Sequence, residues 1–203
     1  MIHPLIMTLA ALLGACTGPG APEPVAPEPP AVVSPPETPP APSAESRALE
    51  LTDRLITLSQ AQDWAALAAY IPAEGLRISG SSLVRPESDP VLSPAAVAGA
   101  ATDTTVYRWG ERPGSGLPWE SPIAALLGDT LAPNTPAAIR TVNGRHDQSH
   151  SSNLSAVYVG HLWVDLHLPA GGEFPAWQSA VVVFRPEGDE LRWVALVLDR
   201  WIP

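Results

Sequence analysis

Hydrophobic positions follow a helical period at the start of the globular part of the chain. Leu51, Leu55 and Leu58 recur at this spacing, and Ser43 can cap a helix that begins near Ala44. Other capping residues precede short apolar runs and predict three further helix starts, at Asp63, Ser93 and Ser121. All the predicted helices therefore lie in the first half of this region.

Towards the C-terminus the pattern changes to a two-residue period, which is typical of β-strands. Within residues 156–168, one side of the predicted strand would carry Leu162, Val164, Leu166 and Leu168, and the other His161, Trp163, Asp165 and His167. Two further strands, 177–185 and 190–201, follow after short connections and predict an antiparallel meander. Shorter strands are predicted at 76–79, 83–85 and 104–109.

Helices that come first and strands that come later indicate an α+β fold, with the N-terminal helices packed on one face of a curved antiparallel sheet. Residues 44–203 form this predicted domain, and their number, about 160, is enough for one hydrophobic core.

The N-terminal residues have the composition of an export signal. Residues 5–13 are apolar but too few for a transmembrane helix, which needs about 20 such residues. They lead into Leu13-Gly14-Ala15-Cys16, which resembles the lipobox of bacterial lipoproteins. The resemblance implies that residues 1–15 are a signal peptide and that Cys16 carries lipid. The first four residues contain no Lys or Arg, unlike the usual signal, and a secretory signal with a chance cysteine is the alternative.

Residues 16–43 are predicted to be a lipid-anchored, proline-rich linker. Eleven of the 25 prolines lie in residues 17–43, where aromatic residues are absent. Such a segment favours extended polyproline II structure and cannot build a core. Thr17 follows the cysteine where an Asp would favour retention in an inner membrane. We therefore expect an extracytoplasmic protein tethered to a membrane, the outer membrane if the host is Gram-negative.

Composition removes several classes of function. The chain has a net charge of −10, eleven Arg and no Lys, so nucleic acid is not an expected partner. Lysine nucleophiles and Schiff bases are excluded. Cys16 is the only cysteine, so a lipidated chain has no disulfide or thiolate metal ligand. No cofactor is expected, because no phosphate-binding or dinucleotide-binding glycine motif is present.

Four stretches resemble segments of bacterial extracytoplasmic proteins, many of them lipoproteins. They are AQDWAALAAYIPAEGLRIS, VYRWGERPGSG, VDLHLPAGGEFPAWQSAVVVF and ELRWVALVLDRW. The resemblance covers most of residues 48–203 and implies an NTF2-like or cystatin-like roll, in which a curved sheet wraps around the N-terminal helix. It implies no particular activity. Residues 131–152 match nothing in that pattern.

The candidate site lies on the polar side of the strand at 156–168. Asp165 and His167 are two residues apart, so both side chains point to one side, ~7 Å apart. Together they could bind a polar ligand or act as an acid–base pair. Trp109 and Trp177 belong to the resemblance stretches and could line a binding mouth by stacking. The alternatives are a solvated strand face and tryptophans that only anchor the fold.

Other polar residues allow weaker interpretations. His161 and Glu173 could extend the site towards a metal, but no metal site is predicted. His146 and His150 lie in a polar stretch that is interpreted as a loop. Asp199 is expected to pair with an arginine such as Arg200 or Arg108.

These patterns favour a non-catalytic envelope lipoprotein that binds a partner protein, a cell-wall fragment or a small ligand. An NTF2-like enzyme that uses Asp165 and His167 for acid–base chemistry is the alternative, and a purely structural module is a third possibility. No recognised catalytic motif is present in the sequence.

Overall fold

The computed structural model describes residues 42–131, 138–146, 150–171 and 176–201. Its helices are α1 (Ala44–Gln60), α2 (Trp64–Ala68), α3 (Pro94–Ala98), α4 (Ile123–Leu131) and α5 (Leu154–Val157). Its strands are β1 (Leu76–Ser79), β2 (Val91–Leu92), β3 (Tyr107–Glu111), β4 (Pro118–Ser121), β5 (Ile139–Val142), β6 (Leu162–Leu168), β7 (Trp177–Glu187) and β8 (Glu190–Trp201). Cys16, the predicted signal peptide and nearly all of the predicted linker lie outside the described residues.

Three of the four predicted helix starts are confirmed by their caps, and the fourth helix, α4, begins at Ile123, close to the predicted start at Ser121. The side chains of Ser43, Asp63 and Ser93 each accept a hydrogen bond, 3.1 Å long, from the backbone N–H three residues later. The second helix, α2, is short and ends at Ala68. None of the helices in the described ranges has the length and hydrophobicity needed to cross a membrane.

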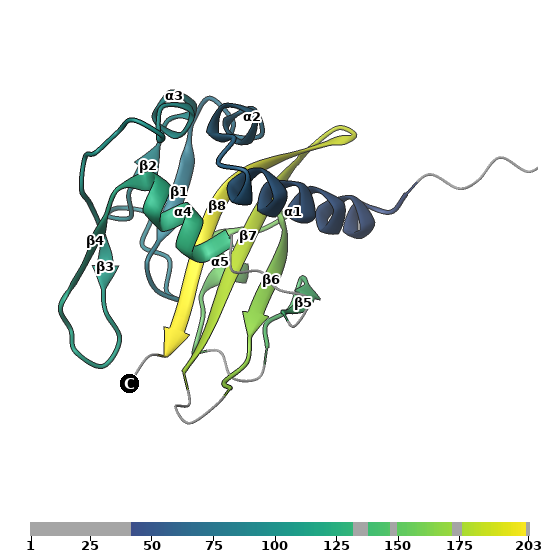
Figure 1. The fold of residues 1–203 in the computed structure, drawn as a ribbon. Coiled ribbons are helices and arrows are strands. Elements are labelled where there is room, and N and C mark those ends of the chain that lie inside the picture. The colour runs from purple at the N-terminus through teal and green to yellow at the C-terminus, as the bar shows by residue number, and fades with distance from the viewer. Residues whose placement is uncertain (1–41, 132–137, 147–149, 172–175, 202–203) are drawn as a thin grey trace, which may run out of the picture. The chain divides into compact units, whose positions relative to one another are not determined.

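The main sheet has the strand order β2-β1-β8-β7-β6-β5. Strands β5, β6, β7 and β8 pair antiparallel in sequence order, which confirms the predicted meander. One pairing differs from the expected antiparallel sheet, because β1 lies parallel to β8. Strands β3 and β4 form a separate hairpin beside the main sheet (Figure 1). The α+β class with N-terminal helices packed on a mainly antiparallel sheet is confirmed.

Two predicted strand segments are wrong. Residues 156–161 form the end of α5 and a turn, in which Gly160 has a φ of +75°. Residues 83–85 form no strand, because the side chain of Asn153 bonds to both the N–H and the C=O of Val84, at 2.8 and 2.9 Å. These backbone groups are therefore not available to a neighbouring strand.

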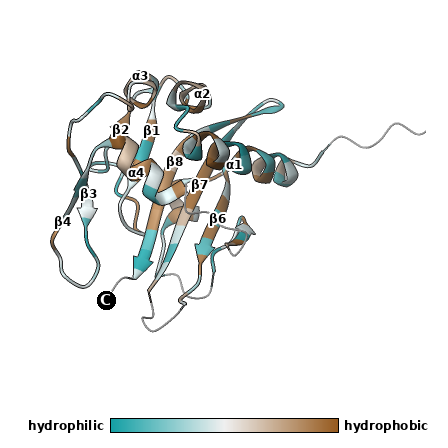
Figure 2. Cartoon of the chain, in the orientation of Figure 1, coloured by the Kyte–Doolittle hydropathy of each residue, from teal (hydrophilic) through white to brown (hydrophobic). Residues whose placement is uncertain are grey.

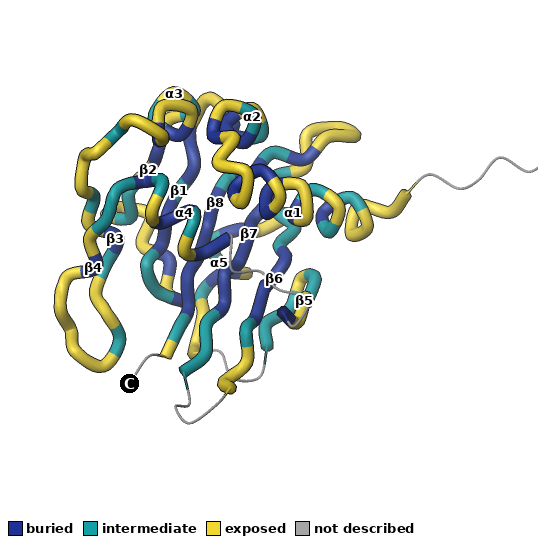
Figure 3. The backbone as a smooth tube through the Cα atoms, viewed as in Figure 1, coloured by how far each residue is buried: buried dark blue, intermediate teal, exposed yellow. Residues whose placement is uncertain are grey.

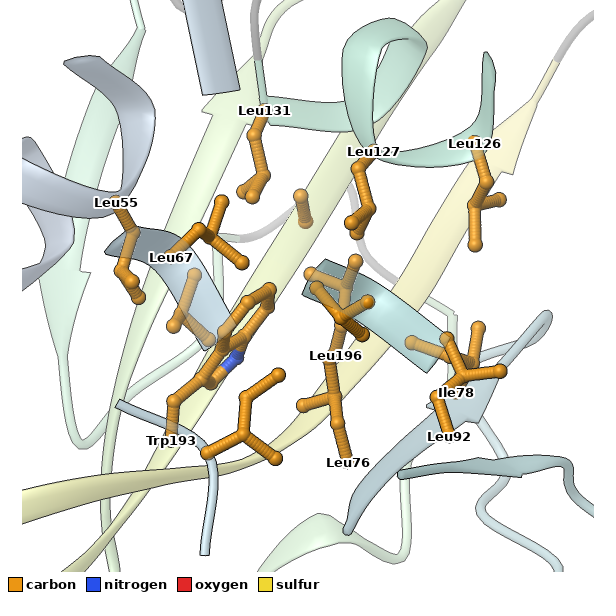
Figure 4. Close-up of a cluster of buried hydrophobic side chains, with 14 of the residues drawn as sticks. Leu55, Leu67, Leu76, Ile78, Leu92, Leu126, Leu127, Leu131, Trp193 and Leu196 are labelled. Atoms are coloured by element: carbon orange, nitrogen blue, oxygen red, sulfur yellow. The ribbon is translucent and has the colours of Figure 1, made fainter. Parts of the chain in front are cut away.

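The main core lies between the helices and one face of the sheet. Leu55 of α1 and Leu127 of α4 pack in the same cluster as Trp193 and Leu196 of β8 (Figure 4). Each large side chain buried in this way contributes roughly 1.5–3 kcal/mol. The alternation predicted for β6 is confirmed here, because Val164 and Leu166 point into this core.

The opposite face of the sheet is also covered. A second cluster joins valines of β7 and β8 to Leu154 of α5 and to Tyr158 and Val84. Strands β7 and β8 are consequently buried along their central lengths (Figure 3). The segment between β5 and β6 supplies this second cover, and it also brings polar side chains onto the sheet.

Candidate functional site

A group of buried polar side chains lies on the sheet face away from α1. It comprises Asp165 and His167 of β6, Ser179 of β7 and Asp199 of β8. His167 is the cross-strand neighbour of Ser179, which is the neighbour of Asp199. The three residues therefore form a row across adjacent strands, near the strand ends that are hydrophilic in Figure 2.

Arg145 connects the two carboxylates of this group. Its Nε donates to Asp165 Oδ2 at 3.0 Å, and its Nη2 donates to Asp199 Oδ2 at 2.7 Å. The Arg145 side chain is 15% exposed, and those of the two aspartates are 0% and 2% exposed. A buried carboxylate needs such a partner, because desolvation without one is costly. We name Arg145, Asp165 and Asp199 the arginine–carboxylate cluster.

Backbone and histidine contacts complete this cluster. The backbone N–H of His146 donates to Asp165 Oδ2, and that of His150 donates to Asp199 Oδ2, both at 3.0 Å. His150 Nδ1 lies 2.6 Å from Asp199 Oδ1, and its side chain is half exposed. These contacts fix both described ends of the segment around residue 147 to the sheet.

His167 is held inside the protein rather than presented to solvent. Its Nδ1 lies 2.8 Å from Ser179 Oγ, and its ring stacks on His146 with centroids 3.9 Å apart. Burial lowers the pKa of His167, and the nearby charge of His146 lowers it further, against the raising effects of Asp165 and Asp199. The imidazole is therefore neutral at neutral pH.

The structure brings together three of the four predicted site residues. Trp177 lies near His167, with ring centroids 5.6 Å apart, on the same side as Asp165. Trp109 lies elsewhere, in the main core, and is 2% exposed. Its Nε1 donates to the backbone oxygen and the hydroxyl of Ser121, at 3.1 and 2.9 Å.

Two weaker interpretations need correction. Asp199 pairs with Arg145 and not with Arg200 or Arg108; Arg108 instead lies 3.5 Å from Glu111. His146 and His150 lie outside the helices and strands, as predicted, but both contact the buried polar group, which the sequence did not indicate.

Metal binding has little geometric support in this part of the molecule. Glu173 lies outside the described residues, and His161 Nδ1 is 3.0 Å from the carbonyl of Val159. In the ranges that the structure describes, no group of three or more His, Cys, Asp or Glu side chains could hold a metal ion.

Sequence reasoning missed Arg145, which lies in the segment that matched no pattern. One signal could have found it. Asp165 and Asp199 lie within strongly apolar strands, and a buried carboxylate needs a cationic partner, which an arginine in a neighbouring polar segment can supply. The spacing alone could not show which of the eleven arginines does so.

A hollow of about 360 Å³ adjoins the arginine–carboxylate cluster. It is bordered by His150, Asp199 and Trp201 on one side and by the β3–β4 hairpin loop on the other. We name it the edge pocket, because it borders the last residues of β8, where β1 no longer pairs. The β1–β8 pairing ends at Ser79 and Val197, and Leu198–Trp201 also line the hollow. Trp201 is 39% exposed there.

A second hollow lies between α4 and the ends of β7 and β8. Its volume is about 50 Å³, and Asp129, Thr130 and Gln178 line it. This space between helix and sheet is much smaller than typical ligand pockets of about 300–1,000 Å³. The edge pocket is within that range.

No family model matches this sequence, and no curated protein matches it either. Among solved structures, a protein from Sphaerobacter thermophilus is 13% identical, with a TM-score of 0.32; the match covers 77% of this chain and 98% of that one. ActVI-ORFA from Streptomyces coelicolor is 14% identical, with a TM-score of 0.33 and coverage of 75% and 93%. At TM-scores this low, neither likeness identifies a family for the chain.

Proposed function

We propose that this chain is a lipid-anchored extracytoplasmic lipoprotein whose NTF2-like domain binds a ligand or partner at the edge pocket. The lipobox-like run that ends at Cys16 and the proline-rich residues after it support the anchor. The domain would be non-catalytic and would present the pocket to an envelope protein, a cell-wall fragment or a small molecule.

One contrast carries the binding proposal. Asp165 and His167 are fully buried and bonded to protein groups, whereas the adjoining edge pocket is open and has a half-exposed histidine and an exposed tryptophan at its rim. A molecule from outside can therefore reach His150 and Trp201 without any rearrangement. Asp165 and His167 would support the pocket indirectly. Asp165 binds Arg145, which lies in the same segment as the pocket residue His150.

Acid–base catalysis by Asp165 and His167 is the second candidate. It is favoured by the lowered pKa of His167, which leaves a neutral imidazole able to accept a proton. It requires the segment around His146 to move, because that histidine stacks directly on the His167 ring.

The binding proposal is tested by recovery of bound material from the solubilised envelope. The full-length chain is immobilised, and bound proteins and small molecules are identified by mass spectrometry for wild type and Trp201→Ala. We expect the variant to recover a specific component at least about five-fold less, because stacking on an exposed aromatic ring is worth roughly 1 kcal/mol or more.

Val159→Ala is the matched control, since Val159 is an apolar residue that is 77% exposed. It should recover the same component as wild type. Equal recovery of every component by wild type and both variants would show that the edge pocket is not the binding surface. The double variant Asp165→Ala, His167→Ala tests whether the buried polar group is needed to shape the pocket.

A further inference from the structure

Two arginines that have no carboxylate partner among the described residues border the edge pocket. Arg112 comes from the β3–β4 hairpin loop and is exposed, and Arg200 comes from β8 and is partly buried. Among the described residues, neither side chain has a carboxylate within 4.0 Å or a hydrogen-bond acceptor. Arg200 lies over Trp119, with its guanidinium carbon 3.4 Å from the ring centroid. Its buried Nε is left without an acceptor in the described part of the chain.

The acidic side chains beside the pocket already have cationic partners. Asp199 is bonded to Arg145 and His150, and Glu111 lies 3.5 Å from Arg108. Neither is therefore a free counter-charge for Arg112 or Arg200. The edge pocket is locally cationic, although the chain as a whole has a net charge of −10.

The environment of Arg200 is unfavourable for its charge. Burial lowers its pKa to about 10, and the nearby charge of Arg112 adds to this effect, whereas Asp129 acts in the opposite direction. An anion placed between the two guanidinium groups would reduce both the desolvation cost and the repulsion.

A larger hollow on another part of the surface differs from the edge pocket in this respect. In a hollow of about 460 Å³, Arg47 and Arg192 lie within ion-pair distance of Asp189 and Glu190, which border the same hollow. Arg54 also borders it and is exposed on α1. In that hollow, arginines and carboxylates of the same lining form ion pairs with each other, unlike Arg112 and Arg200 of the edge pocket.

We propose that the edge pocket binds the anionic group of a ligand, a carboxylate or a phosphate, between Arg112 and Arg200. This inference rests on the proposed function and names the chemistry that the pocket would recognise. A guanidinium fork donates two parallel hydrogen bonds to a carboxylate or phosphate, which fixes the orientation of the ligand. Trp201, exposed at the rim, would contact the apolar body of the same ligand.

The test uses the full-length protein in detergent and two probes, benzoate and inorganic phosphate. Binding is measured by titration calorimetry and by tryptophan fluorescence, which responds at Trp119 and Trp201. We expect saturable binding of at least one probe. Arg112→Gln and Arg200→Gln should each weaken it about ten-fold or more, because each removes charge-assisted hydrogen bonds.

Arg54→Gln is the control, and it should bind each probe as wild type does. Since Arg200 packs on Trp119, Arg200→Lys provides a second variant that keeps the charge and loses only the planar fork. Arg112 is exposed, so its replacement leaves folding intact. Benzoate binding that also weakens in Trp201→Ala indicates a carboxylate with an aromatic body, and phosphate binding that does not weaken there indicates a phosphate ligand.

The inference is overturned if neither probe binds, or if both arginine variants bind the probes as wild type does. These outcomes are separate from failure of the proposed function. One outcome is that Trp201→Ala loses an envelope component that both arginine variants still bind. This outcome would support the binding role and exclude recognition of an anion by the two arginines. Conversely, the probes could bind while no component is recovered from the envelope. This outcome would support the anion site and contradict the proposed role in the envelope.

Discussion

Arg145 holds one positive charge between two carboxylates that are almost fully buried. Replacing it by methionine leaves Asp165 and Asp199 without their shared cation. Removing one member of a buried ion-pair network costs about 3–5 kcal/mol, because the remaining charge stays desolvated. We expect Arg145→Met to lower the free energy of unfolding by about this amount in urea denaturation.

Arg54→Met is the control for this measurement, since Arg54 is exposed on α1 and surface changes usually stay within about 0.5 kcal/mol. Adding Asp165→Asn to Arg145→Met should restore part of the loss by removing one uncompensated charge. A double variant no more stable than Arg145→Met would contradict the electrostatic explanation.

His167 gives stability a dependence on pH. The unfolded chain protonates this residue near the ordinary pKa of 6.5, whereas the folded protein does so only at lower pH. Between these values the unfolded state holds more protons, so the free energy of unfolding falls as the pH decreases below about 6.5. We expect His167→Gln to make this decrease shallower, measured by urea unfolding at pH 7.5 and 5.5.

The charged and titratable groups that face His167 are all retained in the variant, so the comparison isolates the loss of the imidazole. They are His146, Asp165, Asp199 and Arg145. Equal pH dependence in wild type and variant would show that His167 is not responsible.

At the residue level, the sequence predicted the orientation of Asp165 and His167 correctly, because side chains alternate strictly along β6. It could not predict the partner of Asp199. That partner, Arg145, lies 54 positions away and reaches the sheet through a segment without regular periodicity. Such contacts depend on the folded topology and leave no local pattern.

Among the elements, the β3–β4 hairpin lies very close to the end of β1. A Cβ placed on Gly80 would overlap the backbone carbonyl of Trp109. The obstacle is main chain, so it cannot be relieved by a side-chain rotation. We expect Gly80→Ala to lower the free energy of unfolding by about 1–3 kcal/mol in urea denaturation, the usual cost of overpacking.

Gly128→Ala is the matched control, because Gly128 lies in α4 and a Cβ there would have no atom within 4 Å. It should stabilise the protein by about 0.4–1 kcal/mol, since alanine is the better helix former. Equal stability of Gly80→Ala and wild type would mean that the hairpin can shift without cost. The edge pocket depends on this hairpin, so binding of the two probes should weaken in Gly80→Ala as well.

The elements that the sequence predicted well are those with local determinants. Helices α1, α2 and α3 begin at capping residues that bond to their own first turn. Strands β2, β4 and β5 were missed, because two to four residues carry too little periodicity and their pairing depends on other strands. The β3 strand was predicted at 104–109 but spans Tyr107–Glu111. Its ends differ from the prediction because they are set by the pairing with β4.

At the scale of the whole molecule, the expected anchor leads to a prediction about location. In cells, Cys16→Ser should move the full-length chain from the membrane fraction to the soluble fraction and abolish lipid labelling, because the lipid supplies the expected membrane attachment. Thr17→Ala is the control, and it should keep both the membrane attachment and the label. Membrane retention of Cys16→Ser without label would contradict the lipoprotein interpretation.

The parallel pairing of β1 with β8 also constrains the order in which the molecule can fold. Residues 77–79 of β1 must wait for residues 195–197, near the end of the chain, before they gain this neighbour in the sheet. Contacts this distant in sequence slow folding, because a long loop must close before they form. A chain emerging from its N-terminus therefore cannot add β1 to the sheet until residues 195–197 have been released. If the chain is exported, as we propose, this delay is an advantage, since a translocating chain must stay unfolded until it has crossed the membrane.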